Sequence, residues 1–329
     1  MTKISVLAGG IGGARFIRGL QAHLATAEIV AEITVIVNTG DDMWLSGLRV
    51  CPDLDTVMYT LGGGINEEQG WGRPEETTRT SAEIHAYGRG KPWFTLGDLD
   101  LATHIVRTDL LRSGRTLSEV TEFLCERWQP GARLLPMSDQ PVETHVRLAE
   151  DVDGLSVGDL MHFEEWWVRH QAHVAVSEFV RVGGEDADAA PGVLEAIAEA
   201  DLVILPPSNP VVSLGMILAV PGVREAIQST TGAVVGVSPI IGGAPVRGMA
   251  DECLSVIGVE TSAAGVAAHY GSRVSGGLLD AWLVDEVDVE AVSRVESLDI
   301  LAAAVPLWMR DVQSSAAIAA EVLAISARV

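Results

Sequence analysis

Four carboxylates gather within fifteen residues near the N-terminus. The run Asn38-Thr39-Gly40-Asp41-Asp42 follows a β-branched apolar segment, and Asp53 and Asp55 come soon after it. Carboxylates at strand ends commonly bind Mg²⁺, and one of them can also orient or deprotonate an attacking hydroxyl. Asx-turns and helix capping are the alternative uses, and Asp53, directly after Pro52, has the position of a cap. The residues alone leave both interpretations open.

A glycine-rich loop precedes this acidic segment. Gly9, Gly10, Gly12 and Gly13 follow the apolar run 4–8, and helically spaced Phe16, Leu20 and Leu24 come next. Such a loop lets backbone N–H groups and a helix N-terminus approach an anion, and Arg15 and Arg18 add positive charge. The spacing matches neither G-x-G-x-x-G nor the P-loop. The alternative is a tight turn that only packs the strand against the helix.

Two later loops are stiffened by proline and glycine. Pro206 to Pro210 follows a predicted strand at 200–205, and Ser238 to Gly243 follows another at 233–237. Ser208, Asn209, Ser238 and Pro239 are the candidates for contacts with a base, ribose or phosphate, because a stiff loop is preorganised for binding. Rigid turns without a ligand are the alternative.

The elements that must position these loops form an α/β pattern. Strands at 4–8, 33–37, 200–205, 233–237 and 281–284 alternate with helices, which predicts a Rossmann-like, mostly parallel sheet with helices on both faces. Residues 62–165 read as a mainly helical insertion within a single domain, 1–329. Ligands bind at the carboxyl ends of parallel strands, so we expect the polar loops to converge there.

The composition narrows the choice of partners. The net charge of −23 disfavours binding to nucleic acids and to anionic membrane surfaces. Because this charge also repels a phosphate substrate, local groups must attract it. Three scattered cysteines predict neither a zinc site nor disulfides, and they suit a reducing cytoplasm. The N-terminus reads as a strand rather than a signal peptide, and no apolar run reaches the ~18–20 residues of a membrane span.

Taken in order, the motifs resemble one family over residues 4 to about 250. They are Leu7 to Gly13, Asn38 to Asp42, Cys51 to Thr56, Leu96 to His104, Pro136 to Asp139, Pro206 to Pro210 and Ser238 to Gly242. The set is similar to the 2-phospho-lactate transferase family of deazaflavin coenzyme F-420 biosynthesis. Its opening, Gly9 to Phe16, resembles the actinobacterial branch, which transfers phosphoenolpyruvate.

The resemblance implies a reaction. Enolpyruvyl-diphospho-guanosine, or lactyl-diphospho-guanosine in the archaeal branch, would donate its phosphorylated three-carbon acid to the ribityl hydroxyl of the deazaflavin Fo, and GMP would leave. Mg²⁺ is the implied cofactor, with Asp41, Asp42 and Asp53 as ligands. Asp42 and Asp53 are the implied catalytic residues, and Asp53 also holds the position that contacts the deazaflavin. Asn38 and Thr39 would bind substrate, and we expect a homodimer.

One position departs from the family's pattern. Leu99 stands where a basic residue is expected after Gly97-Asp98, so an acceptor contact by an arginine there is not carried over. Arg107 or another basic residue is the candidate substitute. His104, one turn into the predicted helix, fits a structural histidine better than a base. Two rival functions stay open, a nicotinamide dehydrogenase and a non-catalytic nucleotide-binding regulator.

Overall fold

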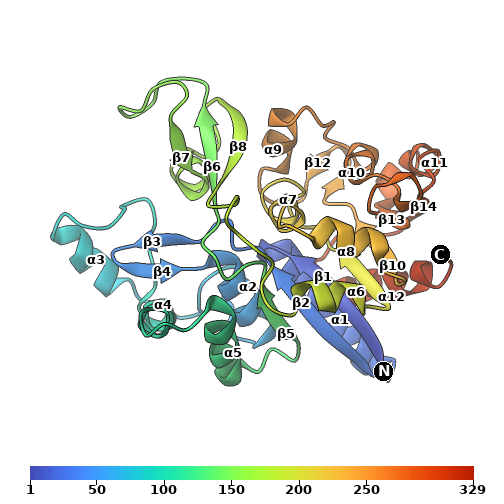
Figure 1. Cartoon of the computed structure of the whole chain (residues 1–329), viewed down its shortest axis with the longest axis horizontal. Coiled ribbons are helices and arrows are strands. Elements are labelled where there is room, and N and C mark those ends of the chain that lie inside the picture. The colour runs from blue at the N-terminus through green and yellow to red at the C-terminus, as the bar shows by residue number, and fades with distance from the viewer.

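A seven-stranded parallel sheet forms the centre of the protein, which we describe from a computed structural model of residues 1–329 (Figure 1). Its strand order is β14-β13-β10-β9-β1-β2-β5. The strands are β1 (Thr2–Ala8), β2 (Ala31–Val37), β5 (Arg133–Pro136), β9 (Leu202–Leu205), β10 (Ala233–Val237), β13 (Ala281–Val284) and β14 (Leu301–Ala304). Every neighbouring pair is parallel, as the apolar, two-sided strands predict.

Helices cover both faces of the sheet, so the predicted α/β architecture is confirmed. One core holds α1 (Gly10–Thr26), α2 (Pro52–Leu61), α5 (Leu117–Trp128) and α12 (Val312–Ser326). The opposite core holds α6 (Val193–Ala198), α7 (Leu214–Leu218), α8 (Val223–Ser229), α9 (Ala250–Val256), α10 (Ala263–Tyr270) and α11 (Ala291–Glu296). Side chains of β1 alternate between these cores, with Val6 in the first and Leu7 in the second.

The last helix of the chain packs on the first. Ile318, Val322 and Ile325 of α12 share the buried core with Phe16 and Leu20 of α1. Gly19 makes the close approach possible, because a Cβ there would lie 2.4 Å from the Cβ of Ser315. Helix α1, whose N-terminus follows β1, is therefore held in place by the C-terminal segment.

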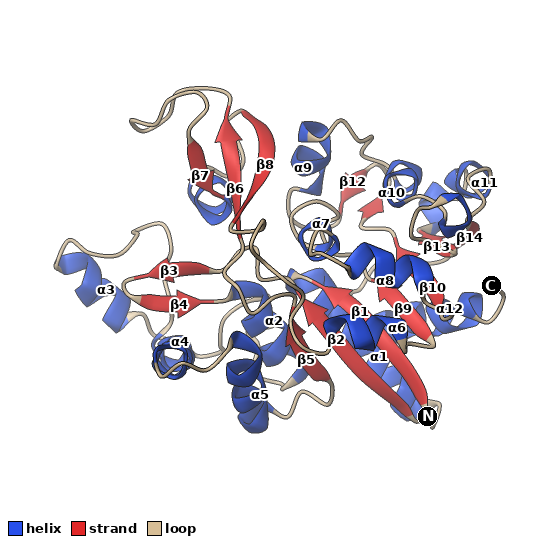
Figure 2. Cartoon of the chain, viewed as in Figure 1, coloured by secondary structure: helices blue, strands red, loops and turns tan.

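Two smaller lobes project from the sheet (Figure 2). One joins the hairpin β3 (Met43–Leu45) and β4 (Leu48–Val50) to α3 (Arg79–Ala86) and α4 (Asp98–Arg112). The other is an antiparallel sheet of β7 (Leu160–His162), β6 (Glu143–Leu148) and β8 (Val176–Val182), and its β7–β8 connection contains a π-helical turn, Glu165–Arg169. Buried Trp166 donates its indole N–H to the carbonyl of Val174, 2.8 Å away, so it belongs to that lobe's core.

The segment 62–165 is helical only as far as Trp128. After it, β5 pairs with β2 in the central sheet, and β6 and β7 follow. The difference arises because Arg133–Pro136 is a short apolar run, which periodicity alone cannot distinguish from buried helix. The remaining elements are β11 (Ile240–Ile241), β12 (Ala244–Pro245) and two 3₁₀ turns at Arg273–Ser275 and Glu286–Asp288. None of the helices has both the length and the apolar character to cross a membrane.

Candidate active site

Loops after three adjacent strands meet at the carboxyl edge of the sheet. Asn38, at the end of β2, donates its side-chain N–H to Asp53 Oδ2 at 2.9 Å and to the carbonyl of Val212 at 3.3 Å. Ser208, after β9, donates to the carbonyl of Gly9 at 2.8 Å and accepts from its N–H at 3.3 Å. The glycine loop, the acidic loop and the Pro206–Pro210 loop therefore share one polar site.

The four glycines are required by close packing. A Cβ at Gly9 would lie 2.8 Å from Asp53 Oδ2, and one at Gly12 would lie 2.4 Å from the carbonyl oxygen of Pro207. A Cβ at Gly13 would meet Ser208 Oγ at 2.7 Å, while Gly10 has φ +62°. The glycines thus bring the N-terminus of α1 directly against Asp53 and the loop after β9.

Three buried carboxyl groups face one another in this site. Burial raises the pKa of Asp53 to about 6, although hydrogen bonds from Asn38 and the Gly10 backbone oppose the rise. Burial, and to a smaller extent the negative charge of Asp53, raises the pKa of Glu164 to about 8. Burial raises the pKa of Asp41 far above its usual range, and the charges of Asp53 and Glu164 raise it further. The site is short of positive charge and suits a cation.

Glu164 was not anticipated from the sequence. It follows β7 in the antiparallel lobe and is 9% exposed. No local motif marks it, since its neighbours Phe163 and Trp166 only indicate a buried segment. It reaches the site because His162, two residues earlier, lies 3.4 Å from the carbonyl of Asp42.

Asp42 has different neighbours from Asp41. Its carboxylate lies 3.6 Å from the guanidinium of Arg49, which also binds Glu143 at 2.6 Å. Burial raises the pKa of Asp42 to about 7, while the charge of Arg49 lowers it. Asp41 and Asp53 therefore form one group of carboxylates, and Asp42 lies at the interface with the β3–β4 hairpin.

Several buried oxygen atoms around this loop have no hydrogen-bond partner. They are Thr39 Oγ1, Asp41 Oδ1, both carboxylate oxygens of Asp42, and Thr144 Oγ1. Buried polar groups are nearly always paired, so unpaired oxygens concentrated on one loop indicate a place for a ligand. Hard oxygen donors of this kind fit Mg²⁺, the cofactor that the sequence resemblance implies.

A second buried cluster lies between α2 and α4. Arg107 binds both oxygens of Asp55, one at 3.0 Å, and His104 lies 3.6 Å from Asp55 and 3.5 Å from Asp100. Asp55, Asp100 and His104 are close enough to hold a metal ion, but the Arg107 guanidinium already neutralises Asp55. The cluster joins two helices. Arg107, 1% exposed, cannot take the place of a basic side chain at the exposed Leu99 position.

The other predicted binding residues already make hydrogen bonds within the protein, Asn209 and Ser238 within their own loops. Asn209 Oδ1 accepts from the N–H groups of Val211 and Val212, at 2.9 and 3.2 Å. Ser238 donates to the carbonyl of Ile240 at 2.8 Å, and Pro239 beside it is buried. Arg15 donates to the carbonyl of Glu67 at 3.4 Å. Of these, the Asn209 loop touches the site directly, through the carbonyl of Val212.

Comparison with known proteins places this arrangement in a family. The family model described as 2-phospho-L-lactate transferase CofD matches residues 4–318. A Streptomyces griseus protein named phosphoenolpyruvate transferase is 60% identical over 327 residues, 99% of each chain. Proteins with that name from Thermobifida fusca and Mycolicibacterium smegmatis are 59% and 53% identical, covering 96% of this chain and 95% and 96% of their own.

Solved structures show the same fold at low identity. The crystal structure of a Bacillus halodurans protein has a TM-score of 0.63 at 16% identity, covering 98% of this chain and 99% of that one. The motifs, the parallel sheet and the match over nearly the whole length agree, and the chain belongs to the 2-phospho-L-lactate transferase family.

Proposed function

We propose that this protein is a magnesium-dependent phosphoenolpyruvate transferase. It moves the enolpyruvyl-phosphate group from enolpyruvyl-diphospho-guanosine to the ribityl hydroxyl of the deazaflavin Fo and releases GMP. The observation that carries the proposal is 60% identity, over 99% of both chains, to a relative named phosphoenolpyruvate transferase. Lactyl-phosphate transfer from lactyl-diphospho-guanosine is the second candidate, since the matching family model is named for 2-phospho-L-lactate.

The bonds that change are simple to account for. The hydroxyl oxygen of Fo forms a bond to the phosphorus that bears enolpyruvate, and the bond from that phosphorus to the oxygen of GMP breaks. The hydroxyl proton passes to a carboxylate or to solvent. Such transfers depend mainly on positioning and on stabilising negative charge. Bound Mg²⁺ would neutralise charge on the diphosphate.

Each residue of the site has a task in this proposal, and Asp53 has two. Asp41, Asp53 and Glu164 are the carboxylates that would hold the metal ion. Asn38 fixes the side chain of Asp53 through its 2.9 Å hydrogen bond. The backbone at Gly9 and Gly10 lies against that carboxylate at the start of α1, where N–H groups of the helix N-terminus would bind phosphate oxygens. Beside its part in holding the metal ion, Asp53 is the residue that we assign to orienting the acceptor hydroxyl.

A direct assay tests the proposal. The protein is mixed with Fo, Mg²⁺ and freshly made enolpyruvyl-diphospho-guanosine, and the phosphodiester product and GMP are followed by mass spectrometry. We expect both products in equal amounts and none in EDTA. Binding of both substrates without product would favour the nucleotide-binding regulator, and quenching of NADH fluorescence would favour the dehydrogenase. Use of the lactyl donor alone would select the second candidate.

We propose a cytoplasmic homodimer. The dimer interface lies outside the apolar face of α12, because Ile318, Val322 and Ile325 are already buried against α1. Light scattering coupled to size-exclusion chromatography measures the mass directly, and a single species near 34.8 kDa would contradict the dimer.

A further inference from the structure

A positively charged recess borders the first turn of α1. It is shallow and is lined by Ile11, Arg15, Arg18, Thr60, Ile65, Glu67 and Gly70. Arg18 binds both carboxylate oxygens of Glu67, one at 3.1 Å, and so neutralises the carboxylate that lines the recess. The Nε of Arg18 is buried and has no hydrogen-bond partner.

Two further arginines reach this recess without a carboxylate partner. Arg15 donates to the carbonyl of Glu67 at 3.4 Å, and Arg247, from the loop after β12, donates to the carbonyl of Gln69. Neither forms an ion pair. Partial burial, and then the nearby charge of Arg15, lower the pKa of Arg247. Both guanidiniums bind backbone carbonyls of the same turn, those of Glu67 and Gln69, so their charges repel each other.

The local charge contrasts with that of the whole chain. Three guanidiniums face one carboxylate here, so two positive charges are uncompensated, although the chain carries a net charge of −23. An oxyanion between Arg15 and Arg247 would remove their repulsion. The planar guanidinium donates two parallel hydrogen bonds to carboxylate or phosphate, which makes such a pair selective for these groups.

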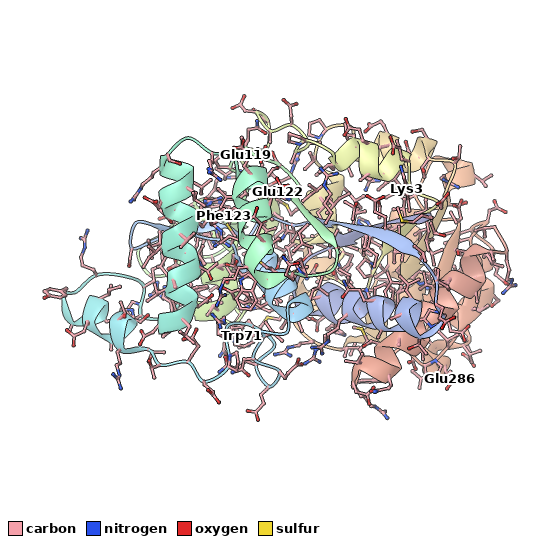
Figure 3. The ribbon with its side chains drawn as sticks, turned by 90° about the horizontal axis from the view of Figure 1, so that it is seen from below. Lys3, Trp71, Glu119, Glu122, Phe123 and Glu286 are labelled. Carbon is pink, nitrogen blue, oxygen red and sulfur yellow. The ribbon has the colours of Figure 1, made fainter.

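The recess is contiguous with the candidate active site. A Cβ at Gly70 would lie 3.0 Å from both Arg247 Nη1 and Ile11 Cδ1, so Arg247 is held beside Ile11. Gly10, the residue before Ile11, lies against Asp53. Arg247 also lies over the ring of Trp71, 5.6 Å from its centroid, and Trp71 is 56% exposed at the surface (Figure 3). A substrate at Asp53 can therefore extend into the recess from the start of α1.

We propose that Arg15 and Arg247 bind an oxyanion of the donor substrate in this recess, either its carboxylate or a phosphate. The identity of the donor rests on the proposed function, but the capture of an oxyanion rests on the recess itself. The pair acts as a specificity determinant because the donor carries both groups and Fo carries neither. Loss of either arginine should weaken donor binding without affecting Fo.

The test compares Arg15→Gln and Arg247→Gln with wild type and with Arg294→Gln. Arg294 is an exposed arginine of α11 that pairs with Glu260, so its variant controls for the loss of one charge. We expect the KM for the donor to rise at least about tenfold in the two recess variants, the cost of a charge-assisted hydrogen bond. The KM for Fo should stay the same. Melting temperatures check that each variant folds.

Calorimetric titration with GDP and with phosphoenolpyruvate identifies the oxyanion and separates this inference from the proposed function. Weaker binding of both ligands assigns the recess to phosphate, and weaker binding of phosphoenolpyruvate alone assigns it to the carboxylate. Either result supports the recess even if wild type forms no product. Unchanged KM for the donor, or unchanged binding of both ligands where there is no turnover, would overturn the inference.

Discussion

Two aspartates of α2, only two residues apart, should respond in opposite ways to the same substitution. Asp53 and Asp55 are both buried, at 7% and 5% exposure, and Asn is nearly the same shape as Asp. Asp55 is bound by the buried guanidinium of Arg107, whereas Asp53 receives hydrogen bonds but no positive charge. Asp55→Asn should therefore destabilise the protein, and Asp53→Asn should stabilise it while removing activity.

The magnitudes follow from burial. Breaking a buried ion pair costs about 3–5 kcal/mol, because Arg107 is left buried and unpaired. Burial raises the pKa of Asp53 to about 6, so ionised Asp53 costs about 3 kcal/mol at about pH 8, at ~1.4 kcal/mol per pH unit. The Asp53→Asn substitution removes that cost and gives up about 0.3–1 kcal/mol of attraction to the α2 N-terminus. We expect a net gain of roughly 2 kcal/mol.

Urea unfolding at about pH 8 in EDTA measures both changes, and the transferase assay with Mg²⁺ measures activity. The expected result is a lower urea midpoint for Asp55→Asn and a higher one for Asp53→Asn. The Asp53→Asn variant should stay folded but lose turnover. If Asp53→Asn lost as much stability as Asp55→Asn, Asp53 would serve as a structural helix cap, and its assignment to the active site would be wrong.

Three further outcomes are expected. In EDTA the melting temperature should fall as pH rises from about 4 to about 8, because the pKa values of Asp53 and Glu164 are higher in the folded protein, near 6 and 8, than in the unfolded chain. Excess Mg²⁺ should reduce that fall, and equal slopes with and without Mg²⁺ would argue against a metal there. Gly12→Ala should cost about 1–3 kcal/mol in urea unfolding, because its Cβ would lie 2.4 Å from the Pro207 carbonyl, and an unchanged midpoint would contradict this contact. Thr144→Val removes a buried hydroxyl without a partner, so the free energy of unfolding of the variant should be unchanged or up to about 1–3 kcal/mol higher. A clearly lower free energy of unfolding would show that the hydroxyl makes a hydrogen bond.

The sequence was sufficient to predict the sheet and the meeting of its loops. Apolar runs such as 233–237 and 281–284 are strands with the expected bounds, and polar residues directly after them must lie at the carboxyl edge. The contact between Asn38 and Asp53, and that between Gly9 and Ser208, follow from this topology. Local patterning was sufficient because each loop is fixed at a strand end.

Side-chain direction within the loops could not be predicted in the same way. Asp41 and Asp42 are adjacent, yet one lies near Asp53 and the other near Arg49, and an irregular loop has no period from which to infer this. The different surroundings of Asp53 and Asp55 can be predicted only once α2 is known to begin at Pro52. Residues two apart on a helix point to nearly opposite sides.

Residues from elements far along the chain could not be assigned to the site from sequence patterns. Glu164 comes from the antiparallel lobe and Arg247 from the loop after β12, each more than a hundred residues from the loops that they approach. Their places depend on how the antiparallel lobe and the loop after β12 pack beside the sheet. Nothing in their own neighbourhood distinguishes them from solvated charges, which is how an isolated Glu or Arg is most often found.

The packing of α12 on α1 has a consequence for synthesis of the protein. Helix α1 begins in the glycine loop, but its apolar face is covered by Ile318 to Ile325, which are synthesised after every strand of the sheet. A nascent chain that has made every loop of the site still lacks the support for its first helix. Activity should therefore appear only after α12 has left the ribosome and packed on α1, and premature termination within the α12 codons should leave an aggregation-prone product rather than a weakened enzyme.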